Sequence, residues 1–149
     1  MSALPDEHRD PRPTPPPTAR GTRIAHIGVA VRSLEEILPF YRDVLELPET
    51  PLDDSDGARI AGLVAGESLV ELLEGQSPES PIGKFVAKRG PGIHHICFNV
   101  DDLDGTLERC RARGIRLIDE QPRRGAEGKR IAFLHPSATA GVLVELSEY

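Results

Sequence analysis

The sequence predicts an α+β fold built from two copies of one module, in which a strand is followed by a helix and then by about three strands. Three observations predict it. The stretches RIAHIGVAVRSLEE and GIHHICFNVDDLDG share the pattern His-Ile-x-x-x-Val followed by a polar helix start. The tetrapeptide LVEL occurs twice, at 69–72 and 143–146. Short strand-like runs follow the expected helix in both halves.

Each module opens with a strand whose apolar side chains alternate with polar or small ones. In the strand at 24–31 the apolar positions alternate with His26, and in the strand at 93–100 they alternate with His95. Because side chains at successive strand positions point to opposite faces, each histidine is expected to face away from the apolar stripe of its strand.

A helix is expected after each of these strands. Ser33 and Glu36 have the spacing of a capping box, and Asp102 takes the equivalent cap position in the second half. Gly114 is a plausible end of the second helix. Pro39 lies beyond the first turn of the first helix and predicts a local kink or an early end there.

The remaining runs complete the two modules. ARIAGLV and SLVELLE are expected strands of the first half, and IRLI, RIAFLH and GVLVELSE of the second. The stretch SPIGKFVAKRGPG joins the halves and predicts a short helix between its prolines. We therefore expect a single domain over residues 22–149, divided into module one at about 22–75, a linker at about 76–91 and module two at about 92–149.

The rest of the composition limits the class of protein. Residues 1–21 contain six of the fourteen prolines and almost no apolar residues, which predicts a disordered tail. A net charge of −6 without a long basic run argues against nucleic acid as a partner. No segment approaches the roughly 20 apolar residues of a membrane helix. Two cysteines cannot supply a disulfide framework, so a cytoplasmic location is expected.

The two LVEL strands each place a carboxylate among apolar residues. A buried carboxylate has to be protonated, paired with a cation or bound to a metal ion. Two equivalent modules would bring His26, Glu71, His95 and Glu145 towards one point. Two imidazoles and two carboxylates suit a divalent ion such as Co, Mn, Ni or Zn. His94 points to the opposite face from His95 and is expected to pack beside the site.

A second group of polar residues lies in RRGAEGKRIAFLHP. Lys129 and Arg130, with free backbone N–H groups, could bind an anionic carboxylate or phosphate of a substrate, and a solvated hairpin is an equal alternative. His135 could border the cleft and bind substrate, or it could cap a turn before Pro136.

Six segments together resemble the methylmalonyl-CoA epimerase family of the vicinal oxygen chelate superfamily: HIGVAV, the LVELLE strand, ESPIGK, GIHHICFNVDDLD, GAEGKRIAFLHP and GVLVEL. The resemblance runs from about residue 23 to the C-terminus. It implies paired βαβββ modules around a metal-bearing cleft, a homodimer and an acyl-CoA substrate. The family's metal ligands fall on His26, Glu71, His95 and Glu145.

The implied reaction is inversion at C2 of 2-methylmalonyl-CoA. Inversion needs proton removal on one face and delivery on the other, and Glu145 is expected to be one of the two acid/base groups. Several bacterial members of the family have a second glutamate at the position of Ile60. Isoleucine cannot transfer a proton, so the second group is unassigned by the sequence.

Two other functions remain open. A glyoxalase I-like isomerase would use similar histidine and glutamate ligands on a thiohemiacetal. A binding protein of the bleomycin-resistance type would sequester a small molecule and would not need four metal ligands. The fold alone does not separate these functions from an epimerase.

Overall fold

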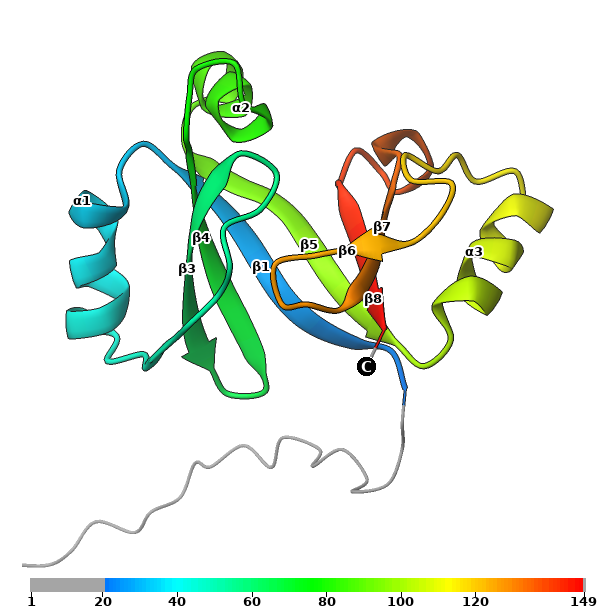
Figure 1. The fold of residues 1–149 in the computed structure, drawn as a ribbon, viewed down its shortest axis with the longest axis horizontal. Coiled ribbons are helices and arrows are strands. Elements are labelled where there is room, and N and C mark those ends of the chain that lie inside the picture. The colour runs from blue at the N-terminus through cyan, green and yellow to red at the C-terminus, as the bar shows by residue number, and fades with distance from the viewer. Residues whose placement is uncertain (1–20, 149) are drawn as a thin grey trace, which may run out of the picture.

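The computed structural model describes residues 21–148, so all but Gly21 of the predicted tail lies outside the described residues. The described strands form one eight-stranded sheet (Figure 1). The first module contains β1 (Arg23–Val31), α1 (Leu34–Pro39), the π-helical turn η1 (Phe40–Val44), β2 (Glu49–Thr50), β3 (Ala58–Ala65) and β4 (Ser68–Gly75). After α2 (Pro81–Arg89), the second contains β5 (Gly92–Val100), α3 (Leu103–Ala112), β6 (Arg123–Arg124), β7 (Arg130–Leu134), the 3-10 turn η2 (Pro136–Ala138) and β8 (Val144–Glu148).

The sheet order is β2-β3-β4-β1-β5-β8-β7-β6. From the centre outwards, each half contains the first strand of its module, then the fourth, the third and the second. The two first strands, β1 and β5, pair antiparallel at the centre. β4 is parallel to β1, and β8 is parallel to β5. Helices α1 and α3 lie at opposite outer ends of the curved sheet, and α2 lies at the top of the view, over β4 of the first module (Figure 1). The predicted α+β fold with two βαβββ modules is confirmed.

Apolar side chains on the outer faces of the sheet hold α1 and α3 in place. In the first module Leu72 is fully buried among Val31 and Leu34. In the second, Leu107 of α3 is buried in a cluster that includes Leu146 of β8. Neither α1 nor α3 covers the inner face of the sheet. The strand residues that alternate with these buried apolar residues therefore face a cleft.

The helix ends follow the predicted caps. Ser33 Oγ accepts the Glu36 N–H at 3.4 Å, and Asp102 Oδ1 accepts the Gly105 N–H at 2.9 Å. The early end predicted at Pro39 is confirmed, because α1 stops there and the chain continues as the wider turn η1. Within the described residues no helix is long and apolar enough to cross a membrane.

One predicted strand is wrong and two short strands were not predicted. The run IRLI at 115–118 forms only an isolated bridge from Leu117 to Leu134. Its backbone instead follows β7 irregularly, since the amides of Ile118 and Asp119 both donate to the Phe133 carbonyl. The edge positions of the sheet are taken by the two-residue strands β2 and β6, which pair with β3 and β7.

We expect Leu72→Ala to lower the free energy of unfolding by about 2–5 kcal/mol, because it empties a fully buried site under α1. Urea unfolding followed by circular dichroism measures the change. Val44→Ala is the matched control, since Val44 is 69 % exposed and its truncation should cost no more than about 0.5 kcal/mol. Equal losses in the two variants would contradict the packing described for α1.

Candidate metal centre and active-site cleft

The four predicted ligands come from the four inner strands of the sheet. His26 lies on β1, Glu71 on β4, His95 on β5 and Glu145 on β8. The register makes these positions neighbours, since Gly28 of β1 pairs with both Glu71 and His95, and Cys97 pairs with Glu145. All four side chains are buried. The structure therefore brings together all four residues that the internal repeat singled out.

The functional atoms of the other three side chains gather around His26 Nε2. His26 Nε2 lies 2.9 Å from His95 Nε2, 3.0 Å from Glu145 Oε2 and 3.2 Å from Glu71 Oε2. His95 Nε2 and Glu145 Oε2 are 3.0 Å apart. Ligand atoms that bind one ion at about 2.1 Å and at right angles to each other are about 3.0 Å apart. The observed separations match those of neighbouring ligands in an octahedral shell.

Hydrogen bonds among the four side chains cannot satisfy all of their polar atoms. An imidazole nitrogen carries at most one hydrogen, so His26 Nε2 cannot donate to both carboxylates and to His95. Glu71 Oε1 is buried and has no hydrogen-bond partner among the described residues. A divalent cation would satisfy all four ligand atoms at once, and oxygen and imidazole nitrogen suit the ions that the sequence predicts. The residues present therefore fit a metal ion.

The two carboxylates differ in their surroundings. Burial raises the pKa of Glu71 to about 7, although His26 acts in the opposite direction. Burial also acts to raise the pKa of Glu145, but hydrogen bonds from His26 and His95 outweigh it and bring the pKa down to about 2. Glu145 is thus the better stabilised anion of the pair.

Small and neutral groups on the sheet make room for the ligands. A Cβ atom on Gly28 would lie 2.2 Å from His95 Cε1, so the imidazole of His95 occupies the space of a missing side chain. Cys97 lies beside the ligands, with a possible ligand atom within 4.8 Å of those of His26 and Glu145. It is a buried free cysteine, and burial strongly raises the pKa of its thiol.

Two residues outside the four contact the ligand histidines. His94 Nδ1 lies 2.9 Å from His95 Nδ1, and its ring packs edge-on against Phe85 of α2. Burial lowers the pKa of His94 to about 4. Glu127 Oε2 lies 4.0 Å from the buried Nδ1 of His26. The rings of both ligand histidines are thus approached by a polar group on the side away from the metal position.

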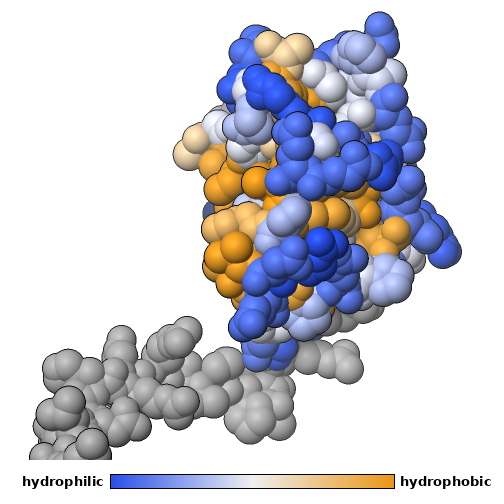
Figure 2. Space-filling model, turned by 90° about the vertical axis from the view of Figure 1, so that its left-hand side faces the viewer, coloured by the Kyte–Doolittle hydropathy of each residue, from blue (hydrophilic) through white to orange (hydrophobic). Residues whose placement is uncertain are grey.

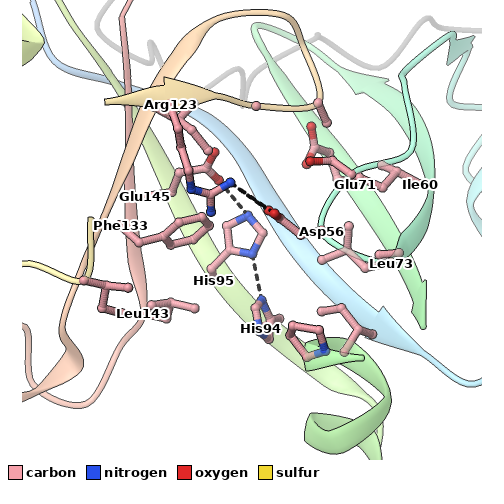
Figure 3. A pocket seen from close by; sticks show the side chains of 18 residues that line it. Asp56, Ile60, Glu71, Leu73, His94, His95, Arg123, Phe133, Leu143 and Glu145 are labelled. Carbon is pink, nitrogen blue, oxygen red and sulfur yellow. Dashed lines mark hydrogen bonds and ion pairs between the residues drawn. The ribbon is translucent and has the colours of Figure 1, made fainter. Parts of the chain in front are cut away.

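A cavity of about 350 Å³ opens above the ligands, between the two modules (Figure 3). Ile60, Glu71 and Leu73 form its module-one wall. Phe133, Leu143 and Glu145 form the facing wall, with His94 and His95 between the walls (Figure 3). The position of Ile60, which the sequence left without a role, is thus on the cleft wall, on the same side as Glu71.

Arg123 is a cleft residue that the sequence analysis missed. Its guanidinium donates to both oxygens of Asp56, at 3.1 and 3.2 Å, and this pair joins the two modules across the mouth of the cleft (Figure 3). Asp119 accepts a further hydrogen bond, and the guanidinium lies over the Phe133 ring, 5.5 Å from its centroid. In the sequence, the only indication of a role for Arg123 was its place in the cation-rich run that also contains Lys129 and Arg130.

None of the three predicted substrate-binding residues lines this cleft, but His135 lines a hollow that adjoins it. Arg130 is paired with Asp104 and Glu148 on the surface and is not among the residues that line the cleft. Lys129, in the β6–β7 turn, borders a separate hollow between that turn and the segment 50–53. His135 caps η2, since its Nδ1 accepts the Ser137 N–H at 3.0 Å. The geometry favours Arg123 over Lys129 and Arg130 as the cation beside the metal centre.

Comparison with known proteins identifies the class to which this fold and this site belong. The chain matches the Glyoxalase/Bleomycin resistance protein/Dioxygenase superfamily over residues 25–133 and belongs to it.

The similar proteins indicate one family within this superfamily. The mitochondrial methylmalonyl-CoA epimerase of Bos taurus is 36 % identical over 129 residues, which cover 85 % of this chain and 74 % of that protein. The ethylmalonyl-CoA/methylmalonyl-CoA epimerase of Cereibacter sphaeroides is 35 % identical, with 85 % and 97 % covered. A variant of Streptomyces coelicolor methylmalonyl-CoA epimerase, solved with 2-nitronate-propionyl-CoA, superimposes with a TM-score of 0.80 at 38 % identity, with 85 % and 93 % covered. The chain belongs to the methylmalonyl-CoA epimerase family, which confirms the predicted enzyme of the isomerase class.

We expect Gly28→Ala to weaken binding of Co²⁺ about 10- to 100-fold, because the added methyl group displaces the His95 ring. Isothermal titration of metal-free protein with Co²⁺ measures the affinity. Gly21→Ala is the control, since a Cβ there meets nothing within 4 Å. Unchanged Co²⁺ affinity in a folded Gly28→Ala variant would exclude His95 as a ligand.

Proposed function

We propose that the protein is a metal-dependent epimerase that interconverts the two C2 stereoisomers of 2-methylmalonyl-CoA. The observation that supports this most directly is the convergence of two histidines and two glutamates, one pair from each module, at the floor of a cleft. The comparisons support the substrate, because relatives over most of the chain are named for this activity. His26, Glu71, His95 and Glu145 hold the ion, which is Co, Mn, Ni or Zn.

The ion supplies one element of the chemistry. A divalent cation polarises substrate oxygens and stabilises the negative charge that develops when the C2 proton leaves. The chain's own residues bind and orient the thioester and move the proton. Phe133, Leu143 and Leu73 help to shield the reacting carbon from water, since they belong to the apolar lining of the cleft.

Inversion requires a proton carrier on each side of C2, and each wall of the cleft offers one buried glutamate. Glu145 acts from module two, in agreement with the sequence. Asp56, at the mouth, is held by Arg123, and Ile60 has no proton to transfer. Glu71 is therefore the carrier on the module-one wall, where its Oε2 faces the ligands and its Oε1 has no partner among the described residues.

The proposal also includes the predicted homodimer and cytoplasmic location. Figure 2 views the side of the molecule with α1 and shows apolar residues among hydrophilic ones on this face. Phe40, Val44 and Leu45, in and next to η1, are 47, 69 and 48 % exposed. Such a cluster on one turn supports self-association.

We expect the purified protein to interconvert (2R)- and (2S)-methylmalonyl-CoA and to lose this activity when a chelator removes the metal. Activity should return with Co²⁺ or Mn²⁺. A parallel assay with methylglyoxal and glutathione tests the glyoxalase I-like alternative. Turnover of the glutathione adduct alone would contradict the proposed substrate. A protein that cannot bind Co²⁺ or Mn²⁺ and turns over neither substrate would favour a small-molecule-binding function.

We expect Glu71→Gln and Glu145→Gln each to slow inversion about 100-fold or more, because glutamine keeps a ligating oxygen but cannot transfer a proton. In deuterated water each variant should still exchange the C2 proton of one stereoisomer, as followed by NMR. Glu67→Gln, an exposed glutamate in the β3–β4 turn, is the control. Inversion by Glu71→Gln at the control's rate would exclude Glu71 as the second carrier.

A further inference from the structure

The two ring nitrogens of His26 have different surroundings. Nε2 faces the other ligand atoms, at 2.9–3.2 Å. Nδ1, the other ring nitrogen, is buried and has no hydrogen-bond partner among the described residues. An imidazole that binds a metal ion through Nε2 carries its hydrogen on Nδ1. Because a buried donor without an acceptor is costly, a metal-bound His26 needs an acceptor beside Nδ1.

One carboxylate is within reach of this nitrogen. Glu127 Oε2 lies 4.0 Å from His26 Nδ1. The two residues come from different modules, since Glu127 lies in the β6–β7 turn and His26 lies in β1. A hydrogen bond from nitrogen to oxygen spans about 2.7–3.2 Å, so a movement of the carboxylate by about 1 Å completes one.

The turn that carries Glu127 is fastened against module one. The amide of Gly125 donates to the Lys129 carbonyl at 2.9 Å, which closes the turn. The amide of Asp53, in module one, donates to the Ala126 carbonyl at 3.4 Å. These hydrogen bonds hold the backbone of the turn in place, so that only the side chain of Glu127 has to adjust towards the imidazole.

The Glu127 side chain is mostly buried, although no lysine or arginine among the described residues is paired with it. It is 16 % exposed, and its one ion pair within the described part of the chain is with His26. A carboxylate withdrawn from water is costly unless it is paired. Glu127 is not among the residues that line the active-site cleft, so contact with substrate does not explain its position. A hydrogen bond to the imidazole of a metal-bound His26 explains it.

We propose that Glu127 is a positioning residue of the metal centre, whose carboxylate accepts the Nδ1–H of His26 and holds the imidazole with Nε2 directed at the ion. This role rests on the proposed function, because it requires the metal ion that His26 binds there. Glu127 acts through His26 and does not touch the substrate. A carboxylate that accepts from a ligand histidine fixes the tautomer and orientation of the ring, and its loss weakens metal binding about 10- to 100-fold.

Calorimetric titration of metal-free protein with Co²⁺ tests this role. We expect Glu127→Ala to weaken Co²⁺ binding about tenfold or more. Glu127→Gln keeps an oxygen that can accept the N–H and should recover part of the affinity. Asp53→Ala is the matched control, since Asp53 is an exposed carboxylate that lines the same hollow as Glu127, and it should keep the wild-type affinity. An equal loss of affinity in Asp53→Ala and Glu127→Ala would indicate a general charge effect and overturn the positioning role.

Proton NMR of the Co²⁺-loaded protein detects the hydrogen bond itself. The ring N–H of each ligand histidine gives a hyperfine-shifted resonance that exchanges with water. We expect Glu127→Ala to shift or broaden the resonance of His26, because its N–H loses the acceptor. The resonance of His95, whose Nδ1 lies 2.9 Å from His94 Nδ1, should stay in place and is the internal control.

These measurements separate the role of Glu127 from the proposed function. If the wild type epimerises methylmalonyl-CoA but Glu127→Ala keeps the wild-type Co²⁺ affinity and both resonances, the positioning role is overturned and the function stands. If Glu127→Ala loses affinity and its His26 resonance moves, but the wild type epimerises no thioester, the positioning role stands and the function fails.

Discussion

The structure depends on the burial of two carboxylates beside two imidazoles at the middle of one sheet. The charge of Glu71 and Glu145 is costly in this position, on the order of several kcal/mol for each unpaired ion. The four ligand atoms lie within 2.9–3.2 Å of His26 Nε2 or of each other. A divalent cation bound by these atoms would compensate that charge, and the backbone pairing of the four strands holds the side chains close together.

The two-module architecture is what makes this geometry possible. Each module supplies a histidine on its first strand and a glutamate on the parallel strand next to it, and the antiparallel contact between β1 and β5 brings the pairs together. Each module also has its own apolar cluster under its outer helix, around Leu72 in one and Leu107 in the other. The apolar packing of the outer faces thus supports the polar centre on the inner face.

Much of this was predictable because it depends on periodicity. Alternation along 24–31 and 93–100 placed both histidines on the inner face, and the repeat located both glutamates without knowledge of the strand order. The predictions that failed concern backbone hydrogen bonds between segments that are distant in the sequence. IRLI has the composition of a strand, but its amides bond irregularly to Phe133, and Arg123–Arg124 takes the edge position instead. The role of Arg123 at the cleft comes from its contact with Asp56, a partner 67 positions away that no local pattern indicates.

The repeat makes the modules similar in backbone but leaves their carboxylates chemically different. Glu145 accepts from both histidines, which holds its pKa near 2, whereas Glu71 contacts only His26 and keeps one oxygen without a partner among the described residues. In both modules the strand of the glutamate adjoins the strand of its own histidine, so the difference comes from the additional contact of Glu145 Oε2 with His26 Nε2 of the other module, at 3.0 Å. An enzyme that inverts a carbon centre has to present a proton carrier on each side of it. In the proposed reaction the duplicated fold meets this need with Glu71 and Glu145, which lie on facing walls of the cleft.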